Sequence, residues 1–253
     1  MTLAMTAGGA RFAPRARWDR DFFLLVVALI WLGILMGFVP EIAAHIRMHK
    51  PAYPPVVHIH AAAFVGWLCL LTTQVALIRG GRADIHRKLG ILGAVLASVM
   101  VVLGLAVSVI VDRLHFGRPD NDPQFLAIQL ADLLNFGVLA AAAIVWRKTP
   151  SAHKRLILLA TIFIADAGFA RWWGDGLARL VGSGDTVWQN WTVFYLSDLL
   201  LVALVGAYDL VTRRRLHPAF IAGSVFGLTV QVIAVWAYVS PWWKPVAIRL
   251  LGH

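Results

Sequence analysis

The sequence predicts an all-α membrane protein built as a bundle of seven transmembrane helices. Of its 253 residues, 60% are hydrophobic and only 14% are charged, and the mean hydropathy is +0.74. A soluble domain has about 45–50% apolar and about 25% charged residues. Seven apolar stretches approach or exceed the roughly 20 residues that a spanning helix needs. This composition excludes a soluble globular domain, and it excludes a disordered chain because such chains are poor in apolar residues.

Short polar segments separate the predicted spans. The spans cover residues 22–39, 57–78, 89–111, 125–146, 156–173, 191–211 and 219–240. Basic turns are expected at 79–88 and 213–218, and polar loops at 40–55, 113–124 and 174–190, the first with room for a short surface helix. The chain therefore divides into a basic cytoplasmic tail at 1–21, a membrane domain at 22–240 and a short outer tail at 241–253.

The basic residues predict the orientation. The face that carries the N-terminus holds 15 of the 23 Lys and Arg residues. Because positive charge is retained on the cytoplasmic side, we expect the N-terminus inside and the C-terminus outside. Counting acids by their nearer face, the net charge of +10 divides into about +11 inside and −1 outside, so it requires no nucleic-acid partner. The single cysteine, Cys69, excludes an intramolecular disulfide framework and a Cys-rich metal site.

Three aspartates lie inside the predicted spans at a similar depth. Asp132, Asp166 and Asp198 each fall roughly 10–12 Å below the outer surface at about 1.5 Å per residue, and His60 roughly 6 Å below it. Ionisable side chains are costly in a bilayer, so they face the bundle interior and mark functional sites. We therefore expect an outward-open polar pocket among the second, fourth, fifth and sixth spans.

Tryptophans gather at the outer ends of the last three spans and would form the rim of this pocket. They are Trp172, Trp173, Trp188, Trp191, Trp242 and Trp243. Indole rings favour the headgroup layer, so an aromatic belt is the favoured interpretation. Stacking against a substrate is the alternative.

The pocket predicts a divalent metal site, because imidazole and carboxylate groups are metal ligands. The expected ligands are His58, His60, Asp132, Asp166 and Asp198, with Asp166 and Asp198 as the catalytic candidates for a general base. The leading hypothesis is an integral membrane protein that binds a metal or small cofactor in this pocket, with a membrane-embedded oxidoreductase or hydrolase acting on a small-molecule substrate as one form of it. Two alternatives stay open: a polar network that only pins the helices together, and a site that translocates a small solute, an ion or a proton.

Two further groups of charged and histidine side chains lie near the outer surface. One is a candidate for metal binding and the other for an ion pair. Glu41, His45 and His49 follow an i, i+4, i+8 spacing, which would place them on one helix face. A solvated interfacial helix is the favoured interpretation of that stretch. Arg171 lies one turn beyond Asp166 and is a candidate partner for an acid.

A heme b site is the alternative cofactor prediction. His86 and His153 both stand at the inner starts of outward-running spans, as two axial ligands at equal depth would. The neighbouring bases Arg87, Lys88, Lys154 and Arg155 would bind the propionates. Such a protein would transfer electrons.

The histidine motifs carry a resemblance. The run HIHAAAFVGWLCLLTTQVALIRGGRADIHRKLG, followed by HKRLILLAT, resembles a group of bacterial multi-pass membrane proteins of uncharacterised activity, over about residues 50–170. The resemblance implies the bacterial inner membrane. More distantly, the layout is similar to transmembrane b-type cytochromes, which carry two histidine pairs on four helices. His86 and His153 match the inner pair, His60 would supply half of the outer pair, and Asp132 stands on the helix where the last histidine is expected.

Overall fold

The computed structural model describes residues 12–13, 16–119, 121–182, 184 and 186–253, which form helices and no strand. The helices are α1 (Asp19–Arg47), α2 (Pro55–Arg79), α3 (Ala83–His115), the 3-10 turn η1 (Pro123–Phe125), α4 (Leu126–Val145), α5 (Pro150–Val181), α6 (Val187–Arg213), α7 (Pro218–Val239) and α8 (Trp243–Leu250). In this part of the chain, seven segments are long and apolar enough to cross a membrane: α1, α2, α3, η1 together with α4, α5, α6 and α7. The prediction of seven spans is confirmed.

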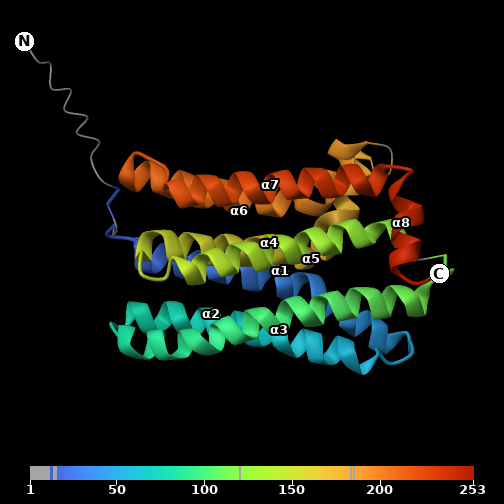
Figure 1. Ribbon diagram of the computed structural model, residues 1–253, viewed down its shortest axis with the longest axis horizontal. Helices are drawn as coiled ribbons and strands as arrows, with labels where there is room; N and C mark the ends of the chain where they lie inside the picture. The colour runs from blue at the N-terminus through green and yellow to red at the C-terminus, as the bar shows by residue number, and fades with distance from the viewer. Residues whose placement is uncertain (1–11, 14–15, 120, 183, 185) are drawn as a thin grey trace, which may run out of the picture.

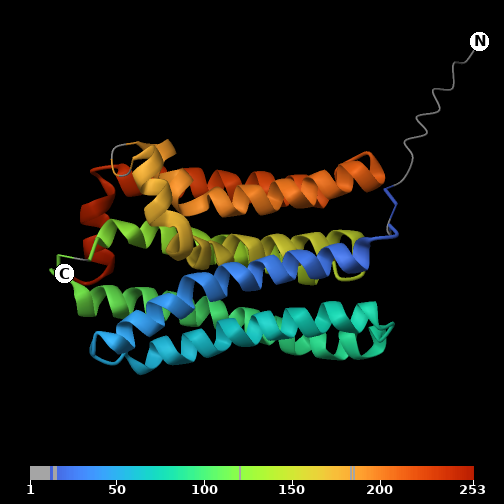
Figure 2. The same cartoon turned by 180° about the vertical axis from the view of Figure 1, so that it is seen from behind.

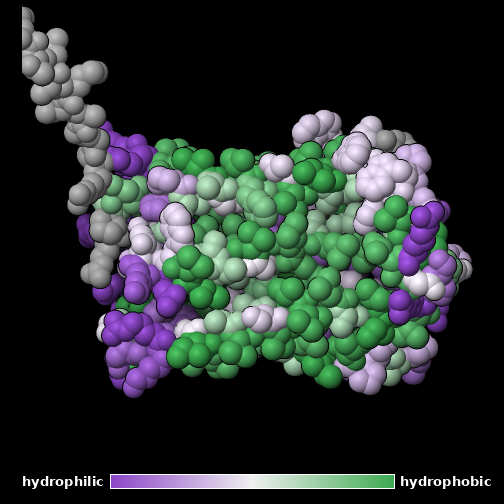
Figure 3. Space-filling model, viewed as in Figure 1, coloured by the Kyte–Doolittle hydropathy of each residue, from purple (hydrophilic) through white to green (hydrophobic). Residues whose placement is uncertain are grey.

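The helices form three layers (Figures 1 and 2). α6 and α7 form one outer layer, α2 and α3 form the other, and α1, α4 and α5 lie between them. Successive spans run in opposite directions, so the start of α1 and the end of α8 lie at opposite ends of the bundle. On the face shown in Figure 3, polar surface gathers at these two ends and an apolar band crosses the middle. This is the surface that a bilayer requires.

Proline and capping side chains set where several helices begin. Pro55, Pro150 and Pro218 each occupy the first turn of a helix, where the missing N–H costs no hydrogen bond. Thr186 caps α6 by accepting from the backbone N–H of Gln189.

α5 is the central helix and is the most buried of the spans. It contacts α1, α4, α6 and α7. Glycines permit its close approach to α1: a Cβ built on Gly168 would lie 2.8 Å from the carbonyl oxygen of Gly33 and 2.8 Å from Ile34 Cα. Gly33 and Gly37 stand four residues apart on α1, the small-xxx-small spacing of close membrane helix pairs.

Three predicted segments differ from the structure. α1 continues through Pro40 to Arg47, so much of the expected outer loop at 40–55 prolongs the first span instead of forming a separate surface helix. α5 likewise continues to Val181, into the expected loop at 174–190. The tail at 241–253 holds α8, whose Ala247 packs with Leu251 against Leu126. Polar and turn-forming residues in these segments led to the prediction of loops. In the structure, helical backbone hydrogen bonds and packing against neighbouring helices continue through them.

Candidate functional site

The three aspartates predicted to lie at one depth meet inside the bundle. Asp132, Asp166 and Asp198 come from α4, α5 and α6. The carboxyl groups of Asp132 and Asp166 lie close enough to share a hydrogen bond, and the Tyr195 hydroxyl donates to Asp132 Oδ1 over 3.1 Å. Two carboxyl groups can share a hydrogen bond only when one of them carries a proton. The pair therefore offers a defined place for one proton.

Asp198 is bound from the side of α7. Gln231 Nε2 donates to Asp198 Oδ2, and both side chains are fully buried. Asp166 is 3% exposed. Within the described part of the chain, Asp166 Oδ1, Asp198 Oδ1 and Gln231 Oε1 are buried without a hydrogen-bond partner. Leaving such atoms unpaired costs about 1–3 kcal/mol each, so the group has unused capacity to bind a proton or a small cation. We call Asp132, Asp166 and Asp198 the aspartate cluster.

Other buried polar atoms surround the aspartate cluster. Gln129 and Asn135 lie one turn to either side of Asp132 on α4, and Trp191 lies on α6. Each has a buried side-chain atom that no described residue satisfies. Trp191, predicted to belong to the aromatic belt, is instead 9% exposed, whereas Trp188 is 69% exposed as a belt residue would be.

A cavity of about 340 Å³ lies on the outer side of the aspartate cluster, between α5, α6 and α7. Its lining includes Ala170, one turn outward of Asp166, and Phe194, one turn outward of Asp198. The predicted pocket among the second, fourth, fifth and sixth spans is therefore partly correct, because the fifth and sixth supply the walls. α7 takes the place expected for the second and fourth spans.

The two histidines expected as metal ligands have other surroundings. His58 is exposed and lies beside Tyr53, with ring centroids 6.5 Å apart. His60 packs on Phe64 of its own helix, with ring centroids 4.2 Å apart. No group of three or more His, Cys, Asp or Glu side chains among the described residues is arranged to hold a metal ion. The aspartates converge, but the structure does not add imidazole ligands to them.

The first outer loop supplies no metal site either. His45 Nε2 lies 2.9 Å from the carbonyl oxygen of Pro51, and its ring stacks on Tyr53 at 4.1 Å. His49 lies beyond the end of α1 with a φ of 50°, so it leaves the helix face predicted for it. Burial raises the pKa of the Tyr53 phenol, and the negative charge of Glu41 raises it further.

Arg171 partners an acid, but not one of the aspartate cluster. Its Nε lies 2.7 Å from Glu41 Oε2, so it joins the outer ends of α5 and α1. Its guanidinium also lies 4.6 Å from the ring centroid of Phe38. The acid that Arg171 pairs with therefore lies on the prolonged part of α1, which the sequence assigned to a loop.

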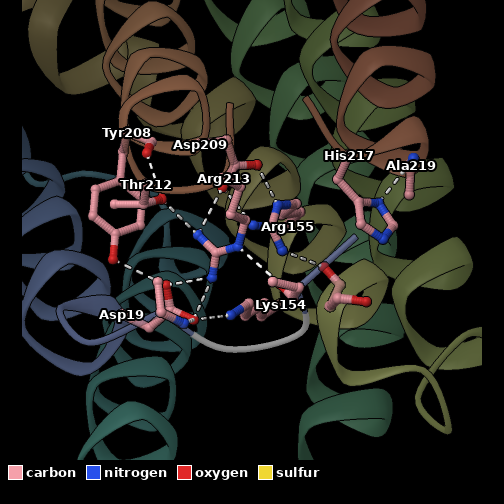
Figure 4. A network of polar contacts seen from close by, with 12 residues as sticks. Asp19, Lys154, Arg155, Tyr208, Asp209, Thr212, Arg213, His217 and Ala219 are labelled. Carbon is pink, nitrogen blue, oxygen red and sulfur yellow. Dashed lines mark hydrogen bonds and ion pairs between the residues drawn. The ribbon is translucent and has the colours of Figure 1, made fainter. Parts of the chain in front are cut away.

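The opposite end of the bundle holds a network of ion pairs (Figure 4). Arg155 of α5 makes a two-pronged contact with Asp209 of α6, with Nε 2.6 Å from Oδ2, and the two side chains are 0% and 1% exposed. Arg213 donates to both oxygens of Asp19 at 2.6 Å and to Asp209 at 3.2 Å. Lys154 adds a second ion pair to Asp19 at 2.6 Å. We call these five residues the inner network.

The segment before α1 packs onto this network. The ring of Phe12 lies 4.6 Å from the guanidinium carbon of Arg155 and 5.2 Å from that of Arg213, distances typical of cation–π contacts. Arg213 Nε also donates to the carbonyl oxygen of Ala13. His217 packs edge-on against Phe12, and burial together with the charge of Arg155 lowers its pKa. The inner end of α5, α6 and α7 is therefore closed.

The inner network was not predicted as a unit. Lys154 and Arg155 were expected to bind heme propionates, but they pair with Asp19 and Asp209 instead. One signal was available in the sequence. Asp209 and Arg213 stand at i and i+4 on one helix, the spacing of a helical ion pair.

The two inner histidines do come together. The rings of His86 and His153 lie edge to face with centroids 6.2 Å apart. His153 Nδ1 lies 2.8 Å from the carbonyl oxygen of Ala143, and Gln74 Nε2 donates to the backbone oxygen of His86. A histidine that donates Nδ1–H to a carbonyl leaves Nε2 free as a metal ligand. Both described cavities lie away from this pair.

The fold and these polar clusters define a class: an integral, multi-pass helical membrane protein with ionisable groups in its interior. No family model, no curated protein and no solved structure matches the chain. Its function is therefore argued from its own residues.

Proposed function

We propose that the protein is a proton-coupled transporter that binds a proton, in exchange for another small cation, at the aspartate cluster. The observation that carries this proposal is the convergence of three buried carboxyl groups from three helices, with Asp132 and Asp166 close enough to share a proton. Intramembrane carboxyls of this kind mark proton relays and ion pathways. The alternative of a purely structural network is disfavoured by the partnerless oxygens of Asp166 and Asp198, since a network that only pins helices would satisfy its members.

The chemistry follows from charge balance. Fully ionised, the aspartate cluster would hold three negative charges in a region of low polarity, which is unfavourable. A proton shared by Asp132 and Asp166 removes one of them. A cation that approaches from the outer cavity replaces that proton at little electrostatic cost, because the total charge of the region stays the same. The cavity lies one helical turn outward of the aspartate cluster, and the ion pairs of the inner network fill the opposite end of the same helices.

We further propose that this outer side faces away from the cytoplasm of a bacterium, with the N-terminus inside. The support is the asymmetry of basic residues. The resemblance of the histidine motifs supports the bacterial inner membrane. The exposed arginines of the short turns, such as Arg82 and Arg147, lie at the end of the bundle that would be cytoplasmic.

The divalent-metal hypothesis has less support than proton binding. Three carboxylates fit a hard cation, which prefers oxygen ligands. The hypothesis also needs His58 and His60, however, and the contacts of these two residues are to Tyr53 and Phe64. A metal-dependent oxidoreductase or hydrolase using Asp166 or Asp198 as a base therefore ranks below proton-coupled transport.

The test is proton flux in proteoliposomes with a pH-sensitive dye inside. An imposed gradient of a small cation such as Na⁺, K⁺ or choline should drive dye-reported proton flux through the wild-type protein, and Asp166→Asn should reduce that flux at least tenfold. Asp84→Asn is the matched control, because Asp84 is an exposed aspartate that pairs with Arg82 at 3.6 Å. Equal flux in the wild-type protein and Asp166→Asn would overturn the proposal.

A redox role at His86 and His153 is the second candidate. The observation in its favour is the edge-to-face approach of the two rings, with the Nδ1 of His153 engaged by a backbone oxygen. His86 and His153 would hold the heme, and the heme would supply the redox chemistry. Optical spectroscopy of the purified protein tests it. A Soret band that His153→Ala abolishes would favour electron transfer, and a protein without one would exclude it.

A further inference from the structure

The cavity on the outer side of the aspartate cluster has a lining of one charge sign. Its charged lining residue is Asp175, which is exposed at the mouth. Among the described residues that line it, none is a lysine or an arginine. The arginine one turn inward of Asp175, Arg171, is held by Glu41. A positively charged ligand would therefore meet carboxylates both at the mouth and beneath the floor.

The two walls of the cavity differ in character. α5 contributes Ala170, Gly174 and Ala178, which follow one another at every fourth residue and leave room on that side. Phe194 of α6 and Tyr238 of α7 contribute aromatic rings, which lie edge to face with centroids 5.5 Å apart. Aromatic faces beside carboxylates are the surroundings that organic ammonium ions favour.

We propose that this cavity binds a small organic cation, an amine or a quaternary ammonium ion, as the solute that exchanges for the proton. The inference rests on the proposed function, because it names the substrate class of the same site. The volume of about 340 Å³ falls at the lower end of ligand pockets. The carboxylate of Asp175 attracts the cation, and the rings of Phe194 and Tyr238 bind its alkyl groups.

Coupling to the proton follows from distance along the helices. Ala170 and Phe194 stand one turn outward of Asp166 and Asp198. One turn of helix is about 5.4 Å, and charges at such a separation interact strongly in the low-polarity interior, where salt screens them little. A bound ammonium ion therefore stabilises the ionised carboxylates below it and expels their proton. One cation enters and one proton leaves, so charge is balanced.

The test uses the full-length protein in lipid nanodiscs, with choline as the cation probe and 3,3-dimethylbutan-1-ol as its neutral isostere. Isothermal titration calorimetry should show choline binding at least tenfold tighter than the isostere. Asp175→Asn and Phe194→Leu should each weaken choline binding about tenfold, while Asp175→Glu retains it. Asp84→Asn is again the control and should bind as the wild-type protein does.

The outcomes separate the two proposals. Equal binding of choline and its isostere, or choline binding that neither Asp175→Asn nor Phe194→Leu weakens, would overturn the organic-cation proposal. Asp84→Asn should retain the proton flux that depends on Asp166, because Asp84 is exposed and lies outside both the cavity and the aspartate cluster. Choline binding without any such flux in the wild-type protein would leave the cavity as a cation site and overturn the proton-coupled function.

Discussion

Removing one partner of the buried pair between Arg155 and Asp209 should destabilise the protein strongly. Asp209→Asn leaves a guanidinium that is 0% exposed facing a neutral amide, so both of its charge-assisted contacts to the carboxylate are lost. Two hydrogen bonds to charged groups are worth about 1.5–3 kcal/mol each. Breaking a buried ion pair costs about 3–5 kcal/mol, in agreement with that sum. We therefore expect the free energy of unfolding to fall by about 3–5 kcal/mol.

The double variant Arg155→Met and Asp209→Leu tests whether the two side chains stabilise the protein as a pair. If they acted independently, its loss of unfolding free energy would equal the sum of the losses in the two single variants. With both charges removed, no guanidinium is stranded, and Arg213 keeps its contact with Asp19. The double variant should therefore lose at least about 2 kcal/mol less than the sum of the single variants.

Unfolding in mixed detergent micelles, followed by tryptophan fluorescence, measures these free energies. Asp84→Asn should change stability by less than about 0.5 kcal/mol, because its pair with Arg82 is exposed. Additive losses in the double variant, or a loss under about 1 kcal/mol in Asp209→Asn, would refute the reasoning.

Three further predictions concern helix packing and pH. Gly168→Ala should lower the free energy of unfolding by about 1–3 kcal/mol, because its Cβ would lie 2.8 Å from the backbone of α1. Gly176→Ala, on the same helix with open space around it, is the control and should be neutral or stabilising. Equal losses in the two variants would contradict this prediction. Burial lowers the pKa of His217 in the folded protein, so its stabilising contribution is complete above the unfolded value of about 6.5 and is lost as the pH falls. His217→Asn retains a side chain that can cap α7 but does not titrate. Between pH 8 and pH 5, its melting temperature should therefore fall less than that of the wild-type protein. Trp67→Phe removes the indole donor to Thr161, and thermal unfolding should report a loss of about 1–2 kcal/mol, while an unchanged melting temperature would show that the bond contributes nothing.

The spans and the aspartate cluster could both be predicted because their signals are local. Twenty apolar residues define a span wherever it packs, and counting residues from the membrane surface gives depth. Asp132, Asp166 and Asp198 were placed in one layer by that count alone. Their actual contact, and the contribution of Gln231 from α7, required the order of the helices in the bundle, which no local pattern specifies.

The inner network was missed for a related reason. Arg155 and Arg213 stand at span ends, where basic residues are expected as interfacial anchors. Their burial depends on helices that are distant in the sequence: Asp209 lies 54 residues from Arg155, and Asp19 lies 194 residues from Arg213. The helical extensions of α1 and α5 were missed because the stretches 40–55 and 174–190 are polar and rich in turn-forming residues. Pro40 removes a single backbone N–H near the end of a long helix, and neighbouring groups in a membrane helix make up for such a loss.

The most direct test of the central claim is an infrared difference spectrum of the protein in lipid, in the carbonyl-stretching region of protonated carboxylic acids. If Asp132 and Asp166 share a proton, the wild-type protein should show a protonated-carboxyl band at neutral pH. The band should disappear in Asp132→Asn and in Asp166→Asn and remain in Asp84→Asn. A wild-type spectrum without such a band, or a band that neither cluster variant changes, would contradict a proton site at the aspartate cluster.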